Sequence, residues 1–158
     1  MSEKQRNRSR IFIEKYAIDY NVQYSDHEEI DKIGISRATF RAMNRCVENL
    51  HIPIDKLYID GTSYEYSGEY IPYDCIIRGD DLIPEIACAS ILAKTYRDEY
   101  IKKLFSENSE ELEDYGIETN MGYGTKKHMD ALKKKGFTRF HRKTFCKKLF
   151  PSNYLSGY

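Results

Sequence analysis

Residues 86–100 read IACASILAKTYRDEY, and their pattern predicts a long helix. Steps of four, three and four residues are each about one helical turn, so four residues share one stripe: Ala87, Ile91, Lys94 and Asp98. We expect most of this stripe to pack on a core, although it ends in a carboxylate. Burying an unpaired carboxylate costs on the order of several kcal/mol or shifts its pKa. Asp98 therefore requires compensation by Lys94, by water at a helix end, or by a bound cation.

The elements on both sides of this helix predict an α/β layered fold. The helix itself extends over residues 82–105 and tolerates Pro84, because this proline lies in its first turn. Strand candidates precede it in NVQYS, KLYIDG and YDCIIRGD. Further helices are expected over residues 9–20, over residues 36–50 with Ser36 as N-cap, and over residues 126–135 with Thr125 as N-cap and Gly136 at the end.

The formal net charge is zero, but the charge is distributed unevenly. Between Gly122 and Phe150 only Asp130 opposes ten basic residues: Lys126, Lys127, Lys133, Lys134, Lys135, Arg139, Arg142, Lys143, Lys147 and Lys148. This asymmetry indicates a polyanionic partner such as nucleic acid. A lysine-rich helix is often only a solvated face, and charge alone favours neither reading.

Cysteines and hydropathy exclude several classes of protein. Cys46, Cys75, Cys88 and Cys146 are scattered without a CxxC pair, which indicates neither a zinc site nor a disulfide framework. No apolar run approaches the length of a membrane span, and the polar N-terminus does not resemble a secretory signal. We therefore expect a reducing, cytoplasmic location.

Two carboxylates are candidates for one cation site. Asp60 ends LYID, at the edge of an α/β sheet where binding sites usually form, although Asp-Gly is also a common strand terminator. Asp98 lies on the stripe that faces the sheet, although it could instead pair with Lys94 or Arg97. Together they could bind Mg²⁺ or Mn²⁺, which prefer carboxylate oxygens. Two such ions could activate water for phosphodiester hydrolysis.

Tyr123 lies between Gly122 and Gly124, next to the predicted basic helix. The loop amides and the helix N-terminus suit a phosphate, and the tyrosine could stack on a sugar or a base. A tight turn with a packed tyrosine explains the same residues equally well.

Four segments, in order and spacing, resemble ribonuclease HII: YIDG, RGDDLIPEIACASILAKTYRDEY, NMGYGTKKHMDAL and FHRKTF. The family reads close to DG, KGD, S-x-ASI-AK-x-x-RD, KGY-x-T-x-x-H and HR-x-SF. The resemblance covers nearly the whole chain. It implies an RNase H-like mixed sheet with flanking helices, in one domain over residues 1–158. Within it we expect an α/β core over 1–121 and a basic helical segment over 122–158.

The resemblance also implies an activity and roles for individual residues. The activity is metal-dependent cleavage, with Mg²⁺ or Mn²⁺, of RNA in RNA–DNA hybrids, including single ribonucleotides in duplex DNA, which leaves 5′-phosphomonoesters. Asp60 matches the third metal-binding carboxylate of the family and Asp98 the fourth. Tyr123 matches the tyrosine that senses the RNA–DNA junction by packing on the sugar after the ribonucleotide. The remaining residues implied in nucleic-acid binding are Lys126, Lys127, His141, Arg142 and Lys143.

The chain departs from the family pattern at three places. Arg78 replaces the usual lysine before Gly-Asp, and Met121 replaces the usual lysine before Gly-Tyr. In addition, the Asp-Glu-Ala-Gly-Arg-Gly motif, which supplies the first two metal ligands from N-terminal strands, does not occur in the chain. We therefore expect a sheet that lacks these strands, with an exposed edge. If the chain compensates by itself, the first candidate ligands are Asp80, Asp81 and Glu85.

Three hypotheses follow from the missing motif. The leading one is a ribonuclease HII whose N-terminal strands are encoded elsewhere, on a longer gene product or on a separate chain, and are needed for full activity. The second is a non-catalytic module that binds RNA–DNA hybrids through Tyr123 and the basic segment. The third is a structural fragment that depends on a partner.

Overall fold

Helix α5, Pro84–Glu107, is the longest element in the part of the chain that the structure describes, residues 1–146. The structure is a computed structural model. Pro84 lies in the first turn of α5, as predicted, but the helix begins at this proline and ends at Glu107, two residues later at each end than predicted. At the first position the missing N–H of proline removes no helical hydrogen bond. Within the predicted basic segment, Lys147 and Lys148 lie outside the described residues.

The chain divides into two units, and α5 passes from one into the other. Unit 1 comprises Met1–Ser25 and Ile35–Tyr96. Unit 2 comprises Asp26–Gly34 and the residues from Arg97 onward. The predicted division into a core over 1–121 and a basic segment over 122–158 stays a prediction.

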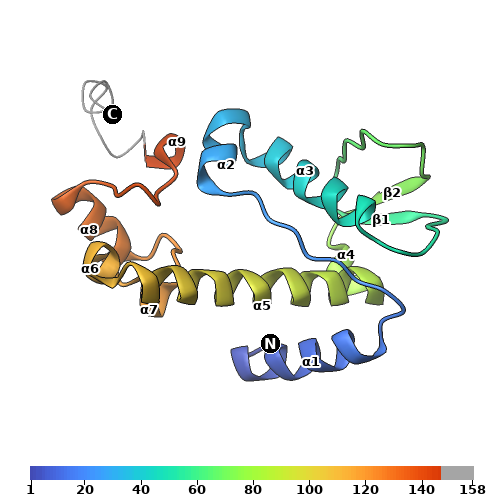
Figure 1. Ribbon diagram of the computed structural model, residues 1–158, viewed down its shortest axis with the longest axis horizontal. Coiled ribbons are helices and arrows are strands. Elements are labelled where there is room, and N and C mark those ends of the chain that lie inside the picture. Colours follow the sequence, from blue (N-terminus) through green and yellow to red (C-terminus); the bar gives the residue numbers. More distant parts are fainter. Residues whose placement is uncertain (147–158) are drawn as a thin grey trace. The chain divides into compact units, whose positions relative to one another are not determined.

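Two of the three predicted strands form, and they pair with each other in unit 1. Strand β1, Leu57–Asp60, and strand β2, Tyr73–Ile76, run parallel and side by side, with Leu57 opposite Tyr73 and Asp60 opposite Ile76 (Figure 1). The expected mixed sheet is not found among residues 1–146, which form this two-stranded parallel sheet and are otherwise mostly helical. Residues 21–25, the NVQYS candidate, form neither strand nor helix, so this predicted strand is wrong.

Helix α1, Glu3–Tyr16, begins earlier than the predicted start at residue 9. The reason is a capping box: the Ser2 hydroxyl accepts from the Gln5 N–H, and the Gln5 side chain accepts from the Ser2 N–H. A polar cluster joins α1 to α5 within unit 1. The Glu14 carboxylate accepts from Arg10 at 2.5 Å and from the Tyr96 hydroxyl at 2.9 Å.

The predicted N-cap at Ser36 is wrong, because Ser36 lies inside helix α3, Ile35–Glu48. Helix α2, His27–Ile33, ends directly before it at Gly34, whose φ of 84° suits glycine. The chain therefore enters α3 from the end of another helix, with no room for a separate capping residue.

The buried face of α5 in unit 1 differs from the predicted stripe. The buried residues are Ile86, Leu92 and Thr95, whereas Ala87 and Ile91 are half-buried and Lys94 is exposed. Thr95 tolerates burial because its hydroxyl donates to helix carbonyls, at 2.8 Å to Ile91 and 3.0 Å to Leu92. A pattern of apolar residues does not reveal a buried threonine whose hydroxyl is hydrogen-bonded within its own helix, so the prediction missed Thr95.

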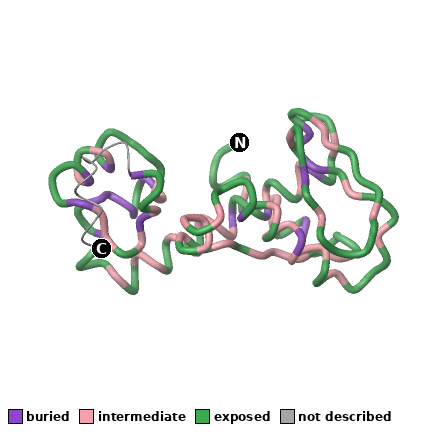
Figure 2. The backbone as a smooth tube through the Cα atoms, turned by 90° about the horizontal axis from the view of Figure 1, so that it is seen from above, coloured by how far each residue is buried: buried purple, intermediate pink, exposed green. Residues whose placement is uncertain are grey.

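Unit 2 is helical and has its own core of Leu112, Tyr115, Ile117, Leu132 and Cys146 (Figure 2, purple). Helix α8, Lys126–Lys135, has Thr125 as its N-cap and ends at Gly136, as predicted. The other helical elements of unit 2, besides α2, are α6 (Ser109–Leu112), the 3₁₀ helix η1 (Glu113–Tyr115), α7 (Ile117–Asn120) and α9 (Lys143–Cys146). Among the described residues, no helix combines the length and the apolar character needed to cross a bilayer.

Candidate functional site

Asp60 is exposed at the last position of β1, where its side chain is held by the start of the next helix. Its Oδ1 accepts a hydrogen bond from the Gly79 N–H at 2.9 Å, at the beginning of α4 (Gly79–Leu82). A Cβ at Gly79 would lie 2.5 Å from the Ile86 Cδ1, so glycine lets α4 approach both α5 and the carboxylate. This bond to Oδ1 leaves Asp60 Oδ2 for a ligand.

Asp98 belongs to unit 2, on the part of α5 beyond the boundary between the units. Its side chain is 14% exposed, and its Oδ1 lies 3.4 Å from the Arg97 Nη1. The compensation that the sequence requires is thus supplied in part by Arg97, one of the two basic partners considered for a paired Asp98.

Arg97 also contacts the loop that carries Tyr123. Its Nη2 donates to the Met121 carbonyl at 3.0 Å, and its guanidinium carbon lies 4.5 Å from the centroid of the Tyr123 ring. Tyr123 is 49% exposed as a residue, so its ring retains surface for a ligand. The arrangement resembles a stacking platform, because a tyrosine ring that contacts an arginine can also pack against a base or a sugar.

Arg142 places a second guanidinium near this platform within unit 2. It lies over the Phe145 ring at 3.8 Å. Burial, and then the positive charge of Arg97, lower the pKa of Arg142, whereas the carboxylate of Asp31 acts in the opposite direction. The side chain nevertheless stays charged, because an arginine is not deprotonated in proteins. Two cations that repel each other favour an anion, such as a phosphate, beside them.

Asp31 of α2 accepts hydrogen bonds from the start of α9, the helix that follows Arg142 in the chain. Its carboxylate accepts from the N–H groups of Lys143 at 2.6 Å and of Thr144 at 3.0 Å, and from the Thr144 hydroxyl. Burial acts to raise the pKa of Asp31, but these hydrogen bonds from Thr144 and Lys143 hold it below its usual value. Asp31 therefore caps α9 from outside it, and no pattern in the sequence indicated this contact.

The predicted phosphate ligands Lys126 and Lys127 are exposed in the first turn of α8, and Lys143 is exposed at the start of α9. Cations in the first turn of a helix oppose its macrodipole, and an anion bound there would relieve this opposition.

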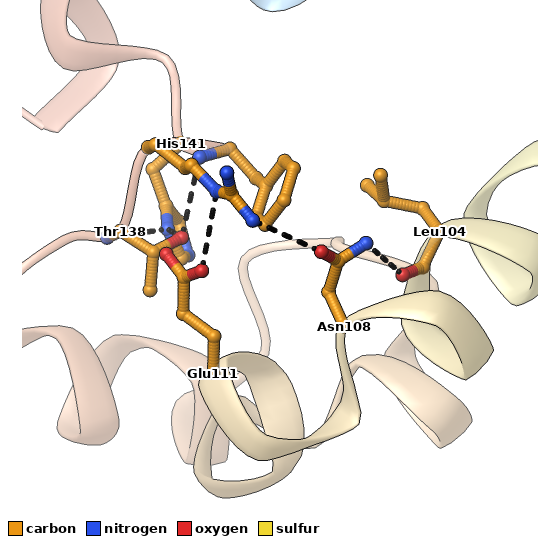
Figure 3. A network of polar contacts seen from close by, with 7 residues as sticks. Leu104, Asn108, Glu111, Thr138 and His141 are labelled. Carbon is orange, nitrogen blue, oxygen red and sulfur yellow. Dashed lines mark hydrogen bonds and ion pairs between the residues drawn. The ribbon is translucent and has the colours of Figure 1, made fainter.

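His141 lies in the interior of unit 2, next to Arg142 in the chain (Figure 3). Its Nδ1 accepts from the Thr138 N–H at 3.0 Å, and its ring lies 4.8 Å from that of Tyr115 and 5.2 Å from that of His128. Burial, followed by the nearby His128, lowers the pKa of His141 to about 4. Its neutral ring supports the chain beside Arg142, and its contact with nucleic acid stays a prediction.

The sequence of the chain is similar to those of known proteins. A sequence model of the ribonuclease HII family matches residues 3–148. The chain belongs to the ribonuclease HII family. It is 44% identical to ribonuclease HII of Christiangramia forsetii over 148 residues, which are 94% of this chain and 71% of the relative. It is 41% identical to ribonuclease HII of Parabacteroides distasonis over 158 residues, which are 100% of this chain and 76% of the relative.

The metal-binding residues implied by ribonuclease HII are divided between the units. Asp60 lies in unit 1 and Asp98 in unit 2, and a site that both share stays a prediction. Within residues 1–146, no group of three or more His, Cys, Asp or Glu side chains could hold a metal ion. The candidate substitute ligands Asp80, Asp81 and Glu85 form no such group either.

One residue of this candidate site, Arg97, was not among the predicted site residues. Arg97 precedes Asp98 in the RD pair of the central motif, and its adjacency to a predicted metal ligand was the available signal. Its contact with Met121 joins residues 24 apart in the sequence, which no local pattern indicates.

Proposed function

We propose that this member of the ribonuclease HII family is an endoribonuclease that cleaves the RNA strand of RNA–DNA hybrids, including single ribonucleotides in duplex DNA. The family match over residues 3–148 carries the proposal, and relatives that are 41% to 44% identical bear the same name. The cleavage leaves 5′-phosphomonoesters.

Asp60 and Asp98 each offer carboxylate oxygens that could bind a hard divalent cation, Mg²⁺ or Mn²⁺. Asp60 offers an exposed carboxylate fixed through one oxygen, and Asp98 a mostly buried one beside Arg97. Both are oxygen donors of the kind these ions prefer. When bound, such ions stabilise charge that develops on a phosphate and lower the pKa of bound water. Two carboxylates are fewer than the four that the family resemblance implies.

The substrate is held by residues of unit 2. Tyr123, backed by Arg97, packs on the sugar that follows the ribonucleotide. The phosphates of the backbone are bound by positive side chains, which orient the duplex without reading its sequence: Lys126, Lys127, Arg142 and Lys143. Stacking thus supplies the preference for a junction, and charge supplies most of the affinity.

The test is cleavage of a DNA duplex that contains one ribonucleotide, with Mg²⁺ or Mn²⁺. The protein is assayed alone and with a polypeptide that carries the Asp-Glu-Ala-Gly-Arg-Gly strands implied by the family resemblance, fused or in trans. We expect weak or no cleavage alone, because fewer ligands hold the ions and the attacking water less firmly, and restored cleavage with the added strands.

Asn substitution tests the two carboxylates in the active form. Asp60→Asn or Asp98→Asn keeps the shape of the side chain and removes its charge, and we expect cleavage to fall roughly a hundredfold or more. Asp130→Asn, on the exposed face of α8, is the matched control and should leave cleavage unchanged. Cleavage that survives Asp98→Asn would exclude this residue as a metal ligand.

A further inference from the structure

Arg97 holds three neighbouring groups with its one planar guanidinium, all within unit 2. One guanidinium nitrogen lies 3.4 Å from the Asp98 carboxylate, and the other donates to the Met121 carbonyl at 3.0 Å. The face of the same guanidinium lies 4.5 Å from the centroid of the Tyr123 ring. A guanidinium can donate along its edges and stack through its face at once, whereas the compact ammonium of lysine cannot.

The loop that Arg97 holds has an unfavourable backbone conformation. Met121 has φ of 50° and Gly122 has φ of 73°, so two consecutive residues are left-handed and one of them carries a side chain. Backbone hydrogen bonds run from the Met121 N–H to the Ile117 carbonyl and from the Tyr123 N–H to the Asn120 carbonyl, both at 2.9 Å. Two side-chain hydrogen bonds also support the turn: the Met121 carbonyl accepts from Arg97, and the Gly122 N–H donates to Asn120 Oδ1 at 2.8 Å. Asn120 is itself buried and donates to the Tyr115 carbonyl at 2.7 Å. Arg97 is therefore one of the two side chains that support the turn.

We infer that Arg97 is a positioning residue that fixes the Tyr123 ring for the sugar at an RNA–DNA junction and links this ring to the Asp98 carboxylate. The inference rests on the proposed roles of Tyr123 and Asp98. It adds a direct connection between the residue that reads the substrate and a residue that holds the metal ion. A shift of Arg97 changes both sites, so binding at one affects binding at the other.

Arg139 provides a matched control in the same unit. It also makes an ion pair with Glu111 at 3.2 Å and a hydrogen bond to the Asn108 side chain at 3.1 Å. Its guanidinium carbon lies 4.7 Å from the centroid of the Phe140 ring. Asn108 and Glu111 lie in the network of Figure 3. Arg139 has no part in the proposed site, so Arg139→Lys reports the general effect of losing such a guanidinium.

The decisive measurement uses the full chain without nucleic acid. The protein contains no tryptophan, so Tyr123→Trp creates a single reporter at the ring position. In this background Arg97→Lys should lower the tryptophan anisotropy and increase quenching by acrylamide, whereas Arg139→Lys should change neither. If Arg97→Lys fails to fold, Arg97→Gln is read in the same way, since it keeps an amide donor for Met121 but lacks the stacking face. Equal anisotropy in the parent and the Arg97 variant would overturn the inference.

A second measurement separates this inference from the proposed function. It compares the Kd for a duplex with one ribonucleotide with the Kd for an all-DNA duplex of the same sequence. Arg97→Lys should reduce the junction preference about as much as Tyr123→Ala, roughly fivefold or more, and the double variant should lose no more than Tyr123→Ala. If Tyr123→Ala alone reduces the preference, the role of Arg97 is refuted. If Tyr123→Ala has no effect, the proposed role of Tyr123 fails, while the anisotropy still decides whether Arg97 positions the ring.

Discussion

At the scale of single residues, His141 shows how burial selects a protonation state. Its Nδ1 accepts a hydrogen bond from the Thr138 N–H, which requires this nitrogen to be unprotonated. The Nε2 is buried and has no hydrogen-bond partner among the described residues. A positive charge on this ring would therefore be poorly solvated, and the neutral form is favoured.

This environment predicts a pH dependence of stability. The pKa of His141 is about 4 in the folded chain and about 6.5 when unfolded. Its contribution is fully present above pH 6.5 and is lost as the pH falls toward 4, because the unfolded state then binds the proton more strongly. The full effect is roughly 3 kcal/mol. The free energy of unfolding in urea should therefore be smaller at pH 5 than at pH 7.5.

Replacing His141 tests whether this residue causes the change in the free energy of unfolding with pH. His141→Asn should flatten the dependence between pH 5 and pH 7.5, although the variant is less stable overall. His51→Asn is the control, because the His51 side chain is 89% exposed. A slope that is unchanged in His141→Asn would show that other groups cause the pH dependence.

At the scale of elements, α4 and α5 approach each other at Gly79. A Cβ there would lie 2.5 Å from the Ile86 Cδ1, so Gly79→Ala should destabilise unit 1 by about 1–3 kcal/mol through overpacking. Ile86→Val removes the clashing methyl group, and Gly79→Ala with Ile86→Val should recover most of the loss. Urea unfolding of the two variants tests this. If the double variant is as unstable as the sum of both changes, the contact with Ile86 is not the cause.

Helix α9 depends on a carboxylate from another element. Asp31→Ala removes three hydrogen bonds to Lys143 and Thr144, which should cost about 1–2 kcal/mol and displace the adjacent Arg142. Affinity for an RNA–DNA hybrid, measured by fluorescence anisotropy, should fall with it. Asp26→Ala removes the N-cap of α2 in the same unit, a bond of 2.7 Å to the Glu29 N–H, and serves as the control. It should reduce stability without a comparable loss of affinity.

The elements that were predictable from sequence are those set by local chemistry. Helix α8 begins after its Thr125 cap and ends at Gly136. Both strands form within the short runs of β-branched and aromatic residues that predicted them. The early start of α1 was also readable, because the Ser2–Gln5 capping box is local. The burial of His141 and the contacts of Arg97 with the Tyr123 loop were not, since they join residues distant in the sequence. The same applies to the parallel pairing of β1 and β2.

At the scale of the whole molecule, the basic segment predicts salt-dependent binding. For every phosphate that the protein no longer neutralises, the slope of log K against log salt should become shallower by about 0.9. We expect a flatter slope when four residues are changed together to Ala: Lys126, Lys127, Arg142 and Lys143. The control changes four basic residues elsewhere and should keep the slope: Lys4, Lys15, Lys32 and Lys103. Equal slopes in both variants would mean that the basic segment is only a solvated face.

The central claim, an endoribonuclease that acts at a ribonucleotide, is tested most directly by mapping the ends of the cleaved strand. The substrate is a DNA duplex with one ribonucleotide, incubated with the protein, the added Asp-Glu-Ala-Gly-Arg-Gly strands and Mg²⁺ or Mn²⁺. Mass spectrometry of the products should show one cut on the 5′ side of the ribonucleotide, with a 5′-phosphate on it and a 3′-hydroxyl on the preceding nucleotide. An intact strand, or equal cleavage of an all-DNA duplex, would contradict the account.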